Sequence, residues 1–225
     1  MEENKPNLAD YNTAELRQVF EKAGQPAYRA RQFIEFVYKK GVRDFGGITS
    51  YPVTLREKLA SDYSLSFPRE IIRKKSPSDG AVKFALETSG GLTESVVMPG
   101  AKGATLCVSS QLGCAMGCVF CATGKMGLKK SLSPSGILGQ VLTAESILKE
   151  ENKRIRNIVF MGMGEPLRNI GSLSRVLDIL LSPFGHGFSP DRITVSTAGL
   201  LDEMRKILRL FPGVRPAISL NAAND

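Results

Sequence analysis

All four cysteines of this 225-residue chain lie between Cys107 and Cys121. The last three, Cys114, Cys118 and Cys121, are spaced as C-x3-C-x2-C. Three thiolates can hold a 4Fe-4S cube and leave one iron open, and the amino and carboxylate groups of a small molecule can then chelate that iron. A four-cysteine zinc knot that recruits Cys107 is the alternative, although zinc sites usually pair their cysteines in two C-x-x-C knuckles. The spacing therefore favours an iron–sulfur centre.

A glycine-rich segment that ends on an acidic residue, Met161-Gly-Met-Gly-Glu-Pro166, follows an apolar, strand-like run. This order predicts a position at the C-terminal mouth of a strand, where barrel enzymes place ligand contacts. Glycine lets a backbone approach a ligand closely, and Glu165 can accept hydrogen bonds from an ammonium group. A tight turn with a helix-capping glutamate is the alternative. Ser196 and the run Ser219-Leu220-Asn221 end the next two predicted strands, so we expect them at the same mouth.

The elements that must position these residues alternate between strand-like and helix-like patterns after residue 101. Strands are predicted over 105–109, 157–161, 192–196 and 214–220. Between the first two, Ser133 and Pro134 provide a cap and a first-turn proline for a helix, and apolar stripes predict two more helices over 173–181 and 200–208. Such alternation is typical of parallel βα units, so the predicted fold class is α/β.

Two segments with different sequence patterns precede this core. Apolar residues at helical spacing predict helices between residues 12 and 65, and short β-type segments separated by glycine-containing turns follow from 68 to 99. We therefore expect a small helical accessory domain over 1–66, a short antiparallel β connector over 67–100 and the α/β core over 101–225.

Thirty Lys and Arg residues against 22 Asp and Glu give a net charge of +8 and a pI near 9.4. This charge favours a polyanionic partner such as RNA, and a merely soluble basic surface explains it equally well. Candidate RNA contacts lie on the helical domain and beside the cysteines, with a solvated face as the alternative. These candidates are Arg29, Arg31, Lys39, Lys40, Lys125, Lys129 and Lys130.

No apolar stretch approaches the ~20 residues that cross a bilayer, so we expect no membrane contact. The polar segment 1–10 has no basic start and apolar run of the secretory kind, and crowded cysteines suit a reducing compartment. We therefore expect a cytoplasmic protein.

A C-x3-C-x2-C motif with an aromatic residue before its last cysteine, opening a run of βα units, resembles the radical SAM superfamily. The segments ATLCVSSQLGC (104–114) and FMGMGEPLRN (160–169) resemble the RlmN/Cfr family of adenosine methyltransferases, over essentially the whole chain. The resemblance implies a (β/α)6-type barrel, of which about four βα units lie here, with a 4Fe-4S cluster and S-adenosylmethionine (SAM) as cofactors. It further implies methylation of adenine in 23S rRNA, at C2 with tRNA as a second substrate or at C8 for Cfr-type members, and an electron donor such as flavodoxin.

The resemblance also implies roles for individual residues. Cys114, Cys118 and Cys121 would bind the cluster, and Glu94 would accept a proton near the target base. Cys107 would form a disulfide with a second cysteine while the enzyme–RNA intermediate breaks down. The SAM contacts would be Gly164, Glu165, Ser196, Ser219, Leu220 and Asn221, the last standing where many RlmN-type sequences have His.

The family's methyl-carrying cysteine belongs to its C-terminal region, and all four cysteines here already have other roles. We therefore expect this chain to be the front part of the enzyme and not to complete methyl transfer alone. A non-catalytic metal-binding or RNA-binding remnant is the alternative from a different class. The single histidine, His186, lies among glycines and serines in a predicted loop, and we expect no catalytic role for it.

Overall fold

The computed structural model describes residues 5–220, which form two compact units. The first unit runs to Phe67 and also contains Arg175–Phe188. The second contains Pro68–Ser174 and continues from Ser189. None of the described helices has both the length and the apolar character that spanning a membrane requires.

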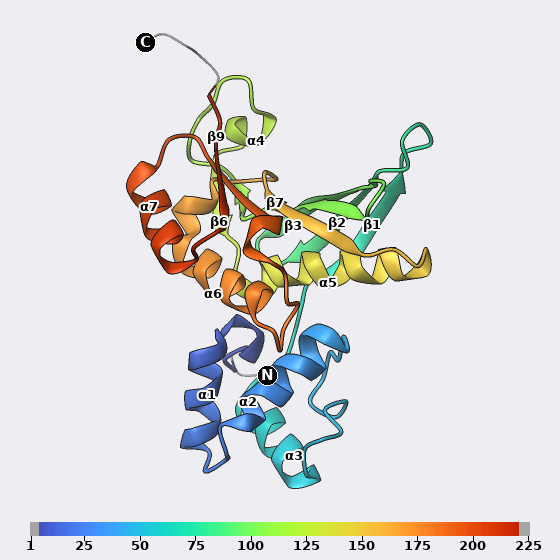
Figure 1. The fold of residues 1–225 in the computed structure, drawn as a ribbon, viewed down its shortest axis with the longest axis vertical. Coiled ribbons are helices and arrows are strands. Elements are labelled where there is room, and N and C mark those ends of the chain that lie inside the picture. Colours follow the sequence, from blue (N-terminus) through green and yellow to red (C-terminus); the bar gives the residue numbers. More distant parts are fainter. Residues whose placement is uncertain (1–4, 221–225) are drawn as a thin grey trace. The chain divides into compact units, whose positions relative to one another are not determined.

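The first unit is helical, as the spacing of its apolar residues predicts. Its elements, coloured blue to cyan in Figure 1, are η1 (Leu8–Asp10), α1 (Thr13–Lys22), α2 (Tyr28–Ile34), the π-helical η2 (Glu35–Lys39) and α3 (Val53–Asp62). Phe20, Phe33 and Tyr38 are among its largest fully buried side chains, and Phe20 packs against both Phe33 and Tyr51. These contacts give the small domain its own apolar core.

Glu15 has two roles in this unit. It closes the capping box of α1 with Asn12, so that each side chain accepts a hydrogen bond from the other's backbone N–H. Its carboxylate also pairs with the Arg175 guanidinium, at 2.7 Å between Oε1 and Nη2 and 2.9 Å between Oε2 and Nε. Nearby, the Thr13 N–H donates to Asp178 at 2.7 Å. The second half of α6 (Ile170–Leu181) is therefore held by the start of α1.

The Glu15–Arg175 pair predicts a pH-dependent contribution to stability. The hydrogen bond from Arg175 lowers the pKa of Glu15 below its ordinary 4.5, against an opposing effect of burial. The stabilisation is therefore fully present above pH 4.5 and is lost as the pH falls through the lowered pKa. We expect Glu15→Gln, which keeps the capping hydrogen bond, to cost about 1 kcal/mol at neutral pH. Urea unfolding should show this difference shrink in acid, where the wild-type carboxyl is also neutral.

The matched control is Glu21→Gln, which removes the Arg17–Glu21 pair from the same helix. Both of those side chains are about half exposed or more, at 64% and 46%, so little change is expected at any pH. A loss for Glu15→Gln that stays constant down to acid pH would show that the ion pair is not its cause.

The second unit is built on a seven-stranded sheet with the order β1-β2-β3-β4-β7-β8-β9. The first four strands are antiparallel neighbours, whereas β4, β7, β8 and β9 are parallel. The strands are β1 (Arg69–Lys75), β2 (Val82–Thr88), β3 (Gly91–Met98), β4 (Ala104–Cys107), β7 (Ile155–Phe160), β8 (Ile193–Thr197) and β9 (Arg215–Ile218). Four parallel strands confirm the α/β class with about four βα units. The antiparallel segment expected as a connector is continuous with this sheet through β3 and β4.

The remaining elements of this unit follow or connect the parallel strands. The long helix α5 (Pro134–Glu150) begins at the predicted Ser133 cap, whose side chain accepts a hydrogen bond from the Gly136 N–H. It runs along one side of the sheet in Figure 1, and apolar side chains of β2, β3, β4 and β7 are buried in this unit, including Phe84, Val97, Leu106 and Ile158. The others are β5 (Gln111–Gly113), α4 (Ala122–Lys125), β6 (Leu128–Ser131), η3 (Pro166–Asn169), η4 (Pro190–Arg192) and α7 (Leu201–Leu210).

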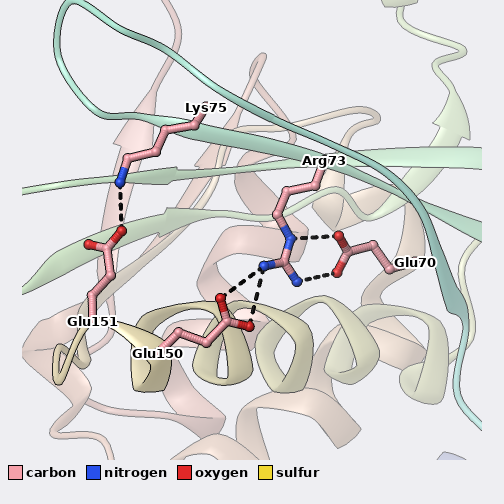
Figure 2. Close-up of polar contacts among 5 residues, drawn as sticks. All are labelled: Glu70, Arg73, Lys75, Glu150 and Glu151. Atoms are coloured by element: carbon pink, nitrogen blue, oxygen red, sulfur yellow. Dashed lines mark hydrogen bonds and ion pairs between the residues drawn. The ribbon is translucent and has the colours of Figure 1, made fainter.

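Charged side chains connect the edge strand β1 to the end of α5 (Figure 2). The Arg73 guanidinium pairs with Glu70 on its own strand at 2.7 Å and reaches Glu150 at 3.4 Å. Lys75 pairs with Glu151 at 2.7 Å. Exposed pairs of this kind add little free energy singly, and charges on an edge strand discourage pairing with another chain.

Candidate functional site

One face of the sheet gathers several of the predicted site residues. In the strand register Val96 lies opposite Cys107, and Cys107 lies opposite Val159. Because side chains alternate along a strand, Glu94 points to the same face as Val96 and Cys107. Val159 lies opposite Thr194, which puts Ser196 on this face as well. The structure therefore brings Glu94, Cys107 and Ser196 to one face of the sheet.

The Glu94 carboxylate lies 2.8 Å from the Lys83 ammonium on the neighbouring strand β2, and both side chains are about half exposed. Its backbone C=O accepts a hydrogen bond from the Ser109 hydroxyl at 2.6 Å. The carboxylate is thus accessible on the site face, while the Ser109 hydroxyl holds the backbone of its strand.

Cys107 differs from the other three cysteines in its environment. It lies at the end of β4, half-buried, and burial raises the pKa of its thiol, with an opposing hydrogen bond to the Met161 backbone. Its position on a strand of the main sheet separates it from the loop that carries the other three thiols.

The other three cysteines lie on a loop held by a two-stranded hairpin, β5 and β6. At the base of this loop, the Cys114 N–H donates to the Gly127 C=O at 3.1 Å. Within it, the Met116 N–H donates to Cys114 Sγ at 3.5 Å, and the Cys121 N–H donates to the Cys118 C=O at 3.0 Å. The hairpin was not predicted from the sequence. The sequence features that could have indicated it are the glycines at its inner ends, Gly113 and Gly127, which both have positive φ.

The chemistry of this loop fits an iron–sulfur cluster. Cys114, Cys118 and Cys121 are all free thiols and half-buried, and one already receives a backbone N–H, as cluster sulfurs commonly do. Within residues 5–220, however, no three Cys, His, Asp or Glu side chains are arranged to hold a metal ion. The loop therefore supplies the donor set, and the three thiols must converge for a cluster to bind.

The glycine-rich loop after β7 lies where the sequence predicts, and its acidic residue is buried. Glu165 is 4% exposed, and each of its carboxylate oxygens accepts a backbone N–H, from Leu167 at 3.1 Å and from Ala198 at 2.8 Å. The side chain thus ties the loop after β7 to the loop after β8. A contact with a ligand ammonium would use the lone pairs that remain on these oxygens.

The backbone at Gly164 lies so close to Gln111 that only glycine fits at this position. Its φ of +93° is in the left-handed region, and a Cβ here would lie 2.4 Å from Gln111 Cβ. Gln111 is itself buried, accepting from the Glu165 N–H at 2.9 Å and donating to Ser131 at 3.1 Å. This loop is therefore packed directly on the hairpin that carries the cysteines.

The last predicted contacts lie after β9. The Ser219 N–H donates to the Thr197 C=O at 2.9 Å, and Leu220 is exposed. Asn221 lies outside the described residues. Ser196 donates its hydroxyl to the Phe160 C=O at 2.7 Å, which links β8 to the end of β7.

Four of the basic residues predicted to contact RNA have contacts inside the first unit. Arg29 donates to the Ser50 C=O at 2.8 Å, Lys39 donates to the Pro183 C=O at 2.6 Å, and Arg31 stacks on Phe184. Lys40 pairs with Glu35. Beside the cysteine loop, Lys125 and Lys129 are exposed and Lys130 donates to Ser89 at 2.7 Å.

Comparison with known proteins supports this assembly of parts. The family model described as the ribosomal RNA large subunit methyltransferase N-terminal domain matches residues 6–65, and that of the radical SAM superfamily matches 108–225. A crystal structure of a radical SAM methyltransferase from Sphaerobacter thermophilus is similar, with a TM-score of 0.88 and 38% identity over 98% of this chain. This chain spans 65% of the length of that protein.

Parallel βα units with a three-cysteine loop after the first strand define a radical SAM domain, which uses a 4Fe-4S cluster and SAM. Because an RlmN-type domain precedes this one, the chain belongs to the RlmN/Cfr family of the radical SAM superfamily.

Proposed function

We propose that this chain forms the cluster-binding and SAM-binding part of a methyltransferase that acts on C2 of an adenine in 23S rRNA and in tRNA. The observation that carries the proposal is the position of Glu94 and Cys107 on one face of the sheet. In the proposed mechanism neither residue takes part in cleaving SAM. Their position on one face would let both act on a base bound there in a later step.

The target explains why a radical route is needed. Adenine C2 is an electron-poor carbon without nucleophilicity, so ordinary transfer of a methyl group from a sulfonium fails. When bound, the cluster supplies the electron that cleaves SAM and yields an adenosyl radical.

Each residue of the site has one proposed role. Cys114, Cys118 and Cys121 would hold the cluster through thiolates. The SAM contacts would be Gly164, Glu165, Ser196, Ser219, Leu220 and Asn221. The buried Glu165 would keep the loops after β7 and β8 at a fixed separation while its free lone pairs face the ligand ammonium.

The other two roles concern the base. Glu94 would accept a proton, and its ion pair with Lys83 holds the carboxylate in place for this step. Cys107 would attack the sulfur that links a second cysteine to the base, so that a disulfide forms as that S–C bond breaks and the departing carbon takes the electron pair and the thiol proton. That second cysteine and the methyl-carrying cysteine are not among the four of this chain.

The proposed partners follow from the same function. They are 23S rRNA, tRNA and a one-electron donor such as flavodoxin, in the cytoplasm. Lys125 and Lys129 are the better placed of the candidate RNA contacts, because both are exposed beside the cysteine loop.

The test is anaerobic reconstitution of the full-length protein with iron and sulfide, followed by dithionite, SAM and a 23S rRNA fragment. Mass spectrometry should find 5′-deoxyadenosine and 2-methyladenosine. Glu94→Gln should still form 5′-deoxyadenosine but give no methylated RNA, because cleavage of SAM does not need the proton acceptor.

Other products would contradict the proposal in different ways. A methyl group on C8 would indicate Cfr-type chemistry. Zinc without iron and sulfide would indicate a non-catalytic metal-binding module.

A further inference from the structure

Gln140 is a fully buried amide on α5 that uses all of its hydrogen-bonding capacity. Its Oε1 accepts from the Ser95 hydroxyl at 2.5 Å and from the Ser109 N–H at 2.8 Å. Its Nε2 donates to the Ser109 C=O at 2.9 Å and to the Gly136 C=O at 3.1 Å. An amide has two donors and two acceptor sites, so nothing remains unpaired.

Ser109 is likewise fully buried and fully paired. Its backbone N–H and C=O both bond to Gln140. Its hydroxyl donates to the Glu94 C=O at 2.6 Å and accepts from the Met163 N–H at 2.8 Å. Gln140 and Ser109 together form what we call the amide node.

The amide node joins the segments that carry the site. β3 carries Glu94, and the end of β4 carries Cys107 two residues before Ser109. The loop after β7 carries Gly164 and Glu165 immediately after Met163. Met163 lies 54 positions from Ser109 in the sequence, and the node holds all of these segments from the side of α5, opposite the site face.

Burying an amide side chain in a core costs more free energy than burying an apolar side chain of similar size. A leucine would avoid burying the carbonyl and the NH2 group of the amide, which an apolar interior tolerates only when both are hydrogen-bonded. Removing the amide alone would leave the Ser109 N–H and C=O without partners. Each of the two residues therefore fixes the position of the other.

We propose that Gln140 and Ser109 are positioning residues for the reaction. They set the strand that carries Glu94 at a fixed distance from the SAM loop. The inference rests on the proposed function, because the reaction for which these residues position the site is the one proposed above.

The first experiment measures amide hydrogen exchange in the cofactor-free protein. Gln140→Leu and Ser109→Ala should each speed exchange of the Met163 amide at least about tenfold, because its acceptor is displaced or removed. The control is Leu138→Ala, a fully buried apolar residue of the same helix without a role in the node. At a matched loss in Tm this variant should leave the Met163 amide within about twofold of wild type.

The second experiment measures the loaded full-length enzyme. Both node variants should raise KM for SAM about tenfold and release more 5′-deoxyadenosine per methylated adenine than Leu138→Ala does. The double variant should lose no more than the worse single variant, because one unit is broken in each case. Gln140→Glu, which retains the acceptor, should recover as the pH falls and its carboxyl gains a proton to donate to the Ser109 C=O.

The two hypotheses fail separately. If wild type forms no 5′-deoxyadenosine, the proposed function is wrong, whatever the exchange rates. If wild type is active but the node variants match Leu138→Ala in exchange, or in KM and product ratio, the amide node is only part of the core and the inference is wrong. Should Gln140→Leu fail to fold, Ser109→Ala and Gln140→Glu decide the question.

Discussion

Replacing Cys118 with alanine is expected to remove the iron–sulfur centre and all formation of 5′-deoxyadenosine. Only three cysteines lie on the loop between β5 and β6, and two thiolates do not hold a 4Fe-4S cube. Iron and sulfide per chain after anaerobic reconstitution, with the electron paramagnetic resonance spectrum of the reduced protein, would measure this loss.

Cys107→Ala is the matched control for Cys118→Ala. Cys107 lies on β4, outside the loop that carries the other three cysteines, so removing it should leave the iron content unchanged. Methyl transfer in the full-length protein should nevertheless stop, because Cys107 serves a later step. Equal loss of metal from both variants would indicate a four-thiol site and contradict the assignment of three ligands.

Gly113→Ala is expected to be among the most destabilising single substitutions in the chain. Gly113 has a φ of +74°, and a Cβ there would lie 1.8 Å from the Gly127 C=O oxygen on the opposite side of the hairpin. No rotamer relieves an overlap between a Cβ and a backbone oxygen, so β5 and β6 must separate at the base of the cysteine loop. We expect a loss of about 3 kcal/mol or more in urea unfolding, together with a loss of bound iron.

Gly117→Ala is the control that distinguishes the effect of this overlap from the effect of backbone strain. Gly117 has a similar φ of +66° on the same loop, but apart from its chain neighbours no residue has an atom within 4 Å of its Cβ position. It should therefore cost only about 1 kcal/mol, the strain of a left-handed alanine. If both variants lost stability equally, strain alone would explain Gly113→Ala and the contact with Gly127 would be irrelevant.

Local patterns account for the parts of the fold that were predicted correctly. Ser133 before Pro134 marks the start of α5, and the apolar runs around Leu106 and Ile158 mark strands of the parallel sheet. Each of these signals lies within a few residues of the element that it specifies. The cysteine spacing is equally local, which is why a cluster site could be predicted on the loop after the first parallel strand.

The missed features depend on contacts between distant residues. β5 and β6 have three and four residues, without an alternating apolar pattern, and Gln111 and Asn169 fix them to the loop after β7. Arg175 meets Glu15, which lies 160 positions away in the sequence. The helix-capping alternative for Glu165 agrees with its hydrogen bond from the Leu167 N–H, but no periodicity could indicate the second bond, from the Ala198 N–H after β8.

The antiparallel strand β3 limits how the barrel can close. β4 is hydrogen-bonded to β3 along one edge and to β7 along the other, so the first parallel strand has no free edge left. A ring of parallel strands cannot close through a strand that is already paired on both sides. The sheet therefore continues past β4 into β3 and does not close into a ring at that strand. Under the proposed function, a sheet left open at this strand would let a base that stays attached to a folded polymer reach the site face from the side.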